Sequence, residues 1–226
     1  MKEKEYIYKF NLVSANVLSI LIFILMCILT VCIKGTIIWT YSSIGILLIA
    51  MILYFAFHEV LHGIGYFIGG CKAKNIYYGV ALEKGILYCL ARQEVKKSNI
   101  LLSLQMPFTV IGVITYIIGL IINDNMLLFL SIANIAGASM DLVMFFYILR
   151  IKSVRYSETD ANDEFVLISK EDLSKRKSIF FKLKEVKDYN EKDFIFKKMK
   201  RVEVSKKSII LLLFLLALSI ITIIIK

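Results

Sequence analysis

The sequence predicts an all-α polytopic membrane protein with about five transmembrane helices and a short cytoplasmic β-hairpin between the second and the third. Three observations lead to this class. Of the 226 residues, 58% are hydrophobic, the mean hydropathy is +0.73, and only one proline occurs. Several apolar stretches have the roughly 20 residues that a helix needs to cross a bilayer. They cover residues 15–33, 37–57, 99–122, 126–149 and 208–225.

The placement of the basic residues predicts the orientation in the membrane. The formal net charge is +10, and all 28 Lys and Arg residues except Lys34 and Lys226 fall on one side if the N-terminus is cytoplasmic. This asymmetry follows the positive-inside rule. We therefore expect a multi-pass protein of the cell membrane with its N-terminus in the cytoplasm and its C-terminus outside. The basic excess then favours contact with anionic lipid of the inner leaflet and argues against nucleic-acid binding.

These spans divide the chain into four parts. A cytoplasmic tail at 1–14 precedes a membrane core at 15–150, which includes the hairpin loop at 71–98. A basic cytoplasmic or interfacial segment at 151–207 and a C-terminal membrane anchor at 208–226 follow. The tail has aromatic residues at alternating positions, which we expect at the membrane interface. The first span is expected to be a retained anchor, because its apolar core is too long for a signal peptide.

The second span leads into the pattern HExxH, formed by His58, Glu59 and His62. His58 and His62 are the only histidines of the chain. Residues four apart on a helix lie on one face, about one turn from each other. Two imidazoles can therefore hold one metal ion, while Glu59 can reach a water beside it. Burying two histidines and a carboxylate inside an apolar run also costs free energy, which indicates a functional site. The pattern predicts a zinc hydrolase with Glu59 as its general base.

The loop after the second span contains two β-prone runs, at 76–82 and 86–92, joined by a connection that ends in Gly85. This arrangement predicts a β-hairpin. Two interpretations remain open at this point. The hairpin is either an amphipathic connector on the membrane surface or an exposed strand edge beside the site. In the second case, the backbone near Tyr78 and Val80 would pair with an extended substrate.

The third span contains the single proline, Pro107. Proline lacks the N–H that would donate to the carbonyl four residues earlier, so it frees the carbonyl of Ser103 and predicts a kink. The kink would either open space beside the metal or serve packing alone.

The fourth span supplies a third candidate ligand, Asp141. Asp141 precedes Arg150 by nine residues and His62 precedes Lys72 by ten, so both lie about 14 Å from the same membrane boundary. Because zinc hydrolases use three protein ligands, we expect Asp141 to complete the set with His58 and His62. Asn134 lies on the same helix face. It would orient substrate, steady Asp141, or form a structural bond between helices.

The basic segment mixes aromatic residues with lysines, which favours a helix lying on the inner leaflet. A small soluble domain or a regulatory tail is the alternative. The last apolar run carries no functional side chain.

The motif, its position in a span and the later aspartate resemble site-2 proteases, which are intramembrane zinc metalloproteases. The run from His58 to Tyr66, the hairpin after it and Met106-Pro107-Phe108 resemble more closely a bacterial family of small membrane zincin metallopeptidases. This resemblance covers about residues 45–150. Site-2 proteases usually carry Asp-Gly on the ligand helix, whereas Leu142 follows Asp141 here.

Together, these observations predict a zinc-dependent intramembrane endopeptidase that hydrolyses membrane-inserted protein or peptide substrates near the cytoplasmic leaflet. The alternative is a membrane protein without catalytic activity, serving in immunity, transport or peptide chaperoning, whose metal or polar cluster is structural. An open coordination position would distinguish the two, because catalysis needs one and a structural site closes it.

Overall fold

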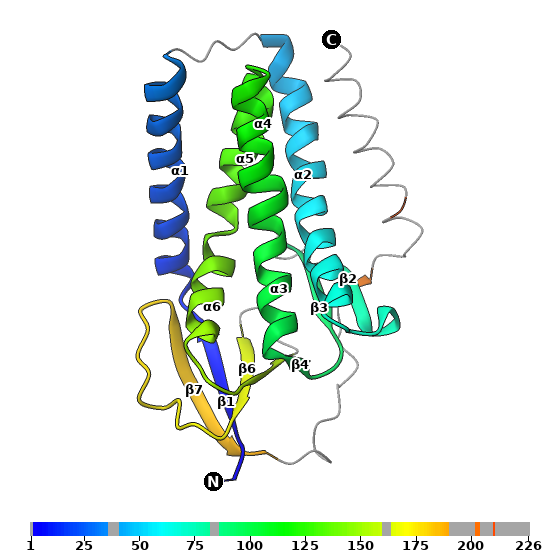
Figure 1. The fold of residues 1–226 in the computed structure, drawn as a ribbon, viewed down its shortest axis with the longest axis vertical. Helices are drawn as coiled ribbons and strands as arrows, with labels where there is room; N and C mark the ends of the chain where they lie inside the picture. Colours follow the sequence, from blue (N-terminus) through cyan, green and yellow to red (C-terminus); the bar gives the residue numbers. More distant parts are fainter. Residues whose placement is uncertain are drawn as a thin grey trace.

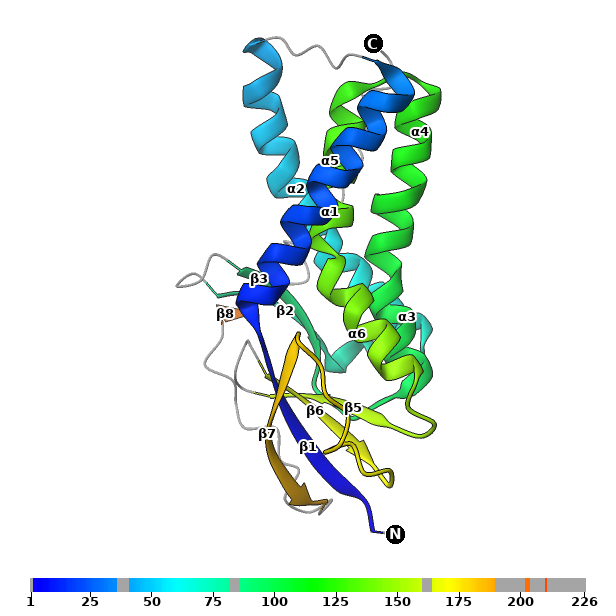
Figure 2. The ribbon, with the colours of Figure 1, turned by 90° about the vertical axis from the view of Figure 1, so that its left-hand side faces the viewer.

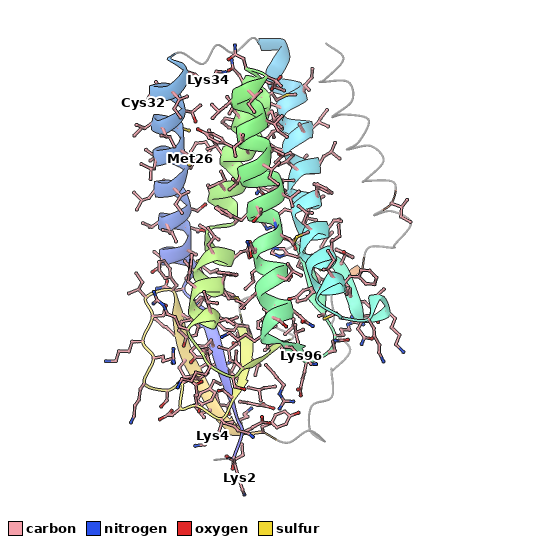
Figure 3. All side chains as sticks on the ribbon, in the orientation of Figure 1. Lys2, Lys4, Met26, Cys32, Lys34 and Lys96 are labelled. Carbon is pink, nitrogen blue, oxygen red and sulfur yellow. The ribbon has the colours of Figure 1, made fainter. Side chains whose placement is uncertain are left out.

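Helices fill one end of the molecule and β-strands fill the other (Figure 1). The structure is a computed structural model that describes residues 2–35, 41–81, 86–159, 164–189, 202–203 and 210. Charged side chains gather toward the sheet end, where Lys4 and Lys96 are labelled, and Lys34 lies at the other end (Figure 3). Apolar side chains such as Met26 occupy the length between them.

The helical end is built from segments that follow one another closely in the sequence. They are α1 (Leu12–Lys34), α2 (Tyr41–Ile68), α3 (Lys97–Pro107), the π-helix η3 (Phe108–Ile114), α4 (Thr115–Ile121), α5 (Asn125–Gly137) and α6 (Ser139–Leu149). The segments α3, η3 and α4 form one continuous helix, whereas α5 and α6 meet at a bend of 44°.

Within the described residues, three helices are long and apolar enough to cross a membrane, and the bent pair α5–α6 is a fourth if it counts as one span. The first four predicted spans are therefore confirmed as apolar helical segments. The predicted fifth span, at 208–225, lies outside the described residues except for Ile210. Helix α1 buries only Ala15 and Thr30, so most of its apolar side chains face outward, as lipid contact requires.

Polar residues define where these helices begin and end. Asn11 caps α1 by accepting a hydrogen bond from the backbone N–H of Ser14. Gly35 ends the same helix with a positive φ of 83°, a conformation that favours glycine. Asp124 caps α5 by accepting from the N–H of Leu127 at 2.7 Å. The Nζ of Lys34 then donates to Asn125 at 2.7 Å and ties the end of α1 to the start of α5.

The opposite end holds a five-stranded antiparallel sheet in the order β4-β5-β6-β1-β7. Its strands are β1 (Lys4–Phe10), β4 (Val95–Lys96), β5 (Arg155–Glu158), β6 (Glu164–Ser169) and β7 (Phe181–Asp188). Strand β1 leads directly into α1, so the sheet lies under the helices (Figure 2). Its core is aromatic: Phe165 is fully buried and stacks on Tyr8 at 5.4 Å between ring centroids.

The prediction of an all-α protein is therefore wrong in part. The residues expected as an interfacial tail form β1, in which Tyr6 and Tyr8 alternate with outward-facing residues. That alternation has the two-residue period of a strand. The helix expected on the inner leaflet is also wrong, since residues 181–188 form β7. Strands β5, β6 and β7 of the basic segment instead share one sheet with β1 and β4.

The predicted hairpin is confirmed by antiparallel pairing of β2 (Ile76–Ala81) with β3 (Ile86–Ala91), after a short 3₁₀ turn, η1 (Ala73–Asn75). The connection at 82–85 lies outside the described residues. A third strand, β8 (Val202–Glu203), pairs with the other edge of β2, where Val80 is opposite Val202.

Candidate metal centre

Helix α2 places both histidines and Glu59 in its last three turns. The two Nε2 atoms of His58 and His62 lie 3.1 Å apart. His62 is only 9% exposed. The four-residue spacing of the sequence therefore brings two nitrogen atoms to one point inside the helical end.

Asp141 reaches this point from α6. Its Oδ2 lies 3.3 Å from Nε2 of His58 and 3.5 Å from Nε2 of His62. The helix axis turns between α5 and α6, and Asp141 stands in the first turn after that bend. The structure thus brings together the three residues that the sequence analysis predicts as ligands.

The spacing of these three atoms fits a zinc ion. Zinc bonds of about 2.0–2.1 Å in a tetrahedron place neighbouring ligand atoms about 3.3–3.4 Å apart. The observed separations of 3.1, 3.3 and 3.5 Å lie around that value. Two imidazole nitrogens and one carboxylate oxygen are also a donor set that zinc accepts, with one position left over.

The other ring nitrogen of each histidine is held by an acceptor. Nδ1 of His58 lies 2.8 Å from Oδ1 of Asn134, and Nδ1 of His62 lies 2.9 Å from the backbone carbonyl of Ser103. Because a carbonyl oxygen only accepts, each Nδ1 carries the proton and each Nε2 presents its lone pair to the cluster. Metal-binding histidines are commonly oriented in this way.

Asn134 forms hydrogen bonds to two other helical segments. Its side chain is 1% exposed, and its Nδ2 donates to the carbonyl of Pro107 at 3.0 Å. The amide therefore links α5 to α2 and to the end of α3. Of the predicted alternatives, the bond between helices is the one that the structure shows.

Glu59 lies beside the cluster. One of its carboxylate oxygens is within 4.8 Å of ligand atoms of both histidines. Asp141 is closer to both rings, with its Oδ2 at 3.3 and 3.5 Å from the two Nε2 atoms. The Glu59 carboxylate also accepts a hydrogen bond from the backbone of Cys89 in β3, so the hairpin is in direct contact with the site.

A cavity of about 190 Å³ opens from the cluster toward the five-stranded sheet. Glu59, His62 and Asp141 form one part of its wall. The hairpin and the sheet contribute others, including Tyr88, Cys89, Phe10, Tyr156 and Glu158. The sequence carries no signal for the last three, because only the tertiary fold brings the sheet to the site.

The cysteine in this wall is not suited to bind the metal. Burial raises the pKa of the Cys89 thiol well above its usual value, and the nearby Glu59 and Glu158 carboxylates raise it further. The thiol is therefore protonated at neutral pH, whereas metal binding uses the thiolate. All four cysteines of the chain are unpaired.

The hairpin residues Tyr78 and Val80 lie on β2, and neither lines this cavity. The Tyr78 side chain packs on Gly63, where a Cβ would lie 1.8 Å from its hydroxyl. An apolar groove of about 370 Å³ runs beside it, lined by Gly63, Ile64, Phe67, Ala73, Ile76, Tyr78 and Ile210. Val80 is partly buried and pairs with β8.

Replacing Gly65 by Ala is expected to damage the centre through the packing of α2 on α3. A Cβ at Gly65 would lie 2.5 Å from the Cα of Ser103, whose carbonyl holds His62. The two backbones would have to separate, and overpacking of this kind costs about 1–3 kcal/mol. We expect a lower midpoint of thermal unfolding, measured by circular dichroism in detergent, together with weaker zinc binding.

Gly137→Ala is the matched control, because a Cβ there would lie 3.9 Å from Phe55, an ordinary contact. This variant should be as stable as the wild type. Equal stability of the two variants would contradict the close approach at Gly65.

Comparison with known families agrees with this description. The model of a family described as "DUF3267: Putative zincin peptidase" matches residues 51–156. The match begins in α2 ahead of the motif and ends in β5, so it includes the hairpin and every side chain of the cluster. No curated protein and no solved structure gives a significant match to the chain.

Proposed function

We propose that the chain is a zinc-dependent intramembrane endopeptidase that cleaves membrane-inserted substrates near the cytoplasmic leaflet. The observation that carries this proposal is the mutual spacing of the two Nε2 atoms and Asp141 Oδ2, which fits one tetrahedral zinc ion. The match to a family of zincin peptidases supports the same class of reaction.

In this proposal His58, His62 and Asp141 hold the zinc, while Asn134 and the Ser103 carbonyl keep the two imidazoles in place. Bound zinc would activate a water molecule and polarise the scissile carbonyl. Glu59 accepts the proton of the attacking water and returns it to the nitrogen of the leaving amine. Its position next to the ligand atoms, without being the nearest carboxylate, suits this role.

We infer that substrate lies in extended form against the hairpin. A helix encloses its own peptide bonds, so a membrane helix must unwind locally before its backbone can reach a catalytic group. The backbone of β3 already contacts Glu59, and the far edge of β2 accepts an added strand, since β8 pairs there. A substrate strand would displace β8 from this edge near Tyr78 and Val80.

The orientation follows from the charges. The sheet carries many of the basic residues at the end of the molecule where β1 begins, whereas Lys34 lies at the other end (Figure 3). By the positive-inside rule, we assign the sheet to the cytoplasmic side of the cell membrane, next to anionic lipid. The cavity between the cluster and the sheet then opens toward the cytoplasm.

The test is metal removal. Purified chain in vesicles is expected to contain one zinc ion and to cleave an apolar peptide of transmembrane length that carries a fluorophore and a quencher. A chelator should abolish cleavage, and added zinc should restore it. Purified protein that binds no zinc, or cleavage that a chelator leaves unchanged, would contradict the proposal. Tight zinc binding without hydrolysis would favour the structural-metal alternative.

A further inference from the structure

Pro107 leaves one backbone acceptor free, and the candidate site uses it. In a regular helix the N–H of residue 107 would donate to the carbonyl of Ser103. Proline has no N–H, so this carbonyl loses its helical donor. In the structure, the same carbonyl accepts from Nδ1 of His62 at 2.9 Å, and the Ser103 hydroxyl donates to the carbonyl of His62, also at 2.9 Å.

The carbonyl of Pro107 itself supports the other histidine. Directly after Pro107 the chain enters the π-helix η3, in which backbone bonds join residues five apart rather than four. Nδ2 of Asn134 donates to the Pro107 carbonyl at 3.0 Å, and Oδ1 of Asn134 accepts from Nδ1 of His58 at 2.8 Å. Gly112, in the same π-helix, lets α5 come close: a Cβ there would lie 3.3 Å from Nδ2 of Asn134.

We propose that Pro107 is a positioning residue that orients both imidazoles of the metal centre. Because residue 107 has no N–H, the Ser103 carbonyl can accept from His62. The Pro107 carbonyl accepts from the Asn134 side chain, which in turn accepts from His58. This inference rests on the proposed function, because it concerns the same centre. A kink that served packing alone would leave the carbonyls of Ser103 and Pro107 without side-chain partners.

Pro107→Ala returns the missing N–H to α3. The new donor competes with His62 for the Ser103 carbonyl and allows the helix to continue in regular form through residues 103–107. Loss of a hydrogen-bond partner behind a metal-binding histidine typically lowers metal affinity by about 10–100-fold. We expect Pro107→Ala to bind zinc at least about 10-fold more weakly than the wild type. Alanine favours helix, so the variant should remain folded.

The experiment uses the full chain without a histidine tag, in detergent, with zinc and cobalt(II) as probes. Zinc affinity is measured by competition with a chromophoric chelator, and the visible spectrum of bound cobalt reports ligand geometry. Val113→Ala, a truncation in the same π-helix away from the cluster, is the matched control and should behave as wild type. Asn134→Leu, which removes the link between Pro107 and His58, should lose zinc affinity by a similar factor.

A second readout needs no metal. Because His58 and His62 are the only histidines, ¹⁵N-histidine labelling gives the signals of these two rings alone. In metal-free wild type Nδ1 of His62 should be protonated and bonded to the Ser103 carbonyl, and in Pro107→Ala its Nδ1 signal should shift because that bond is lost.

The possible results separate the two proposals. Unchanged zinc affinity, cobalt spectrum and histidine signals in Pro107→Ala would overturn the role of Pro107, while zinc binding by the wild type would stand. Wild type that binds no zinc would remove the proposed function, and the Nδ1 signal of His62 would still test whether Pro107 orients its ring.

Discussion

Replacing Glu59 by Gln is expected to abolish peptide hydrolysis while the metal stays bound. Glutamine has nearly the same shape as glutamate, but its amide cannot accept the proton of the attacking water. General-base catalysis contributes a factor of about 10²–10⁴, so the rate should fall by at least that much. The three atoms assigned to zinc are on other residues, so the zinc content should remain that of the wild type. Rates are measured with the quenched transmembrane peptide, and zinc by elemental analysis of the same sample.

Glu164→Gln is the matched control for this change. It also removes a carboxylate, but Glu164 pairs with Lys184 on the sheet and does not line the cavity. We expect wild-type hydrolysis and wild-type zinc content. If Glu59→Gln cleaved peptide at the wild-type rate, Glu59 would not be the base. If it lost its zinc, Glu59 would be a ligand instead.

Asp141→Ala is expected to lose the zinc. The change removes one of three ligands and leaves His58 and His62 alone, which is fewer than zinc hydrolases use. The loss of affinity should exceed the roughly 10–100-fold cost of losing a partner behind the ligands. Zinc content after purification and competition with a chelator measure the effect. Hydrolysis should be lost together with the metal.

Ser139→Ala provides the comparison within the same helix turn. Ser139 is buried, but it has no contact with the cluster among the described hydrogen bonds. This variant should keep its zinc. Full zinc content and wild-type affinity in Asp141→Ala would show that the third ligand lies elsewhere, with Glu59 as the next candidate.

The arrangement at the candidate site could be predicted because helix geometry is local. A rise of about 1.5 Å per residue fixes the depth of any side chain once the membrane boundary is known. That calculation places Asp141 level with His62, and the structure shows the two within 3.5 Å. The same reasoning at Pro107 predicts the free carbonyl of Ser103. It could not say which group would use it, because His62 belongs to another helix.

The sheet could not be predicted in this way, because its strands pair over long distances in the chain. Tyr6 lies opposite Leu167 on one side and Val186 on the other. The alternation of Tyr6 and Tyr8 is too short to identify a strand without those partners. In β7 the alternation is also present, but lysines between the apolar residues resemble the polar face of a surface helix. Tertiary pairing therefore decided the structure of both segments.

The position of β1 in the sheet has a consequence for biogenesis. This strand is synthesised before the helices, yet the hydroxyl of Tyr6 donates to the carbonyl of Glu171, 165 residues later. Closing so long a loop is slow, and it becomes possible only after the intervening helices have been made and inserted. Phe10 and Tyr156, which both line the cavity, lie near the two ends of that long loop. The cavity is thus completed only late in synthesis. A nascent chain that had already bound a metal would still lack part of the cavity wall around it.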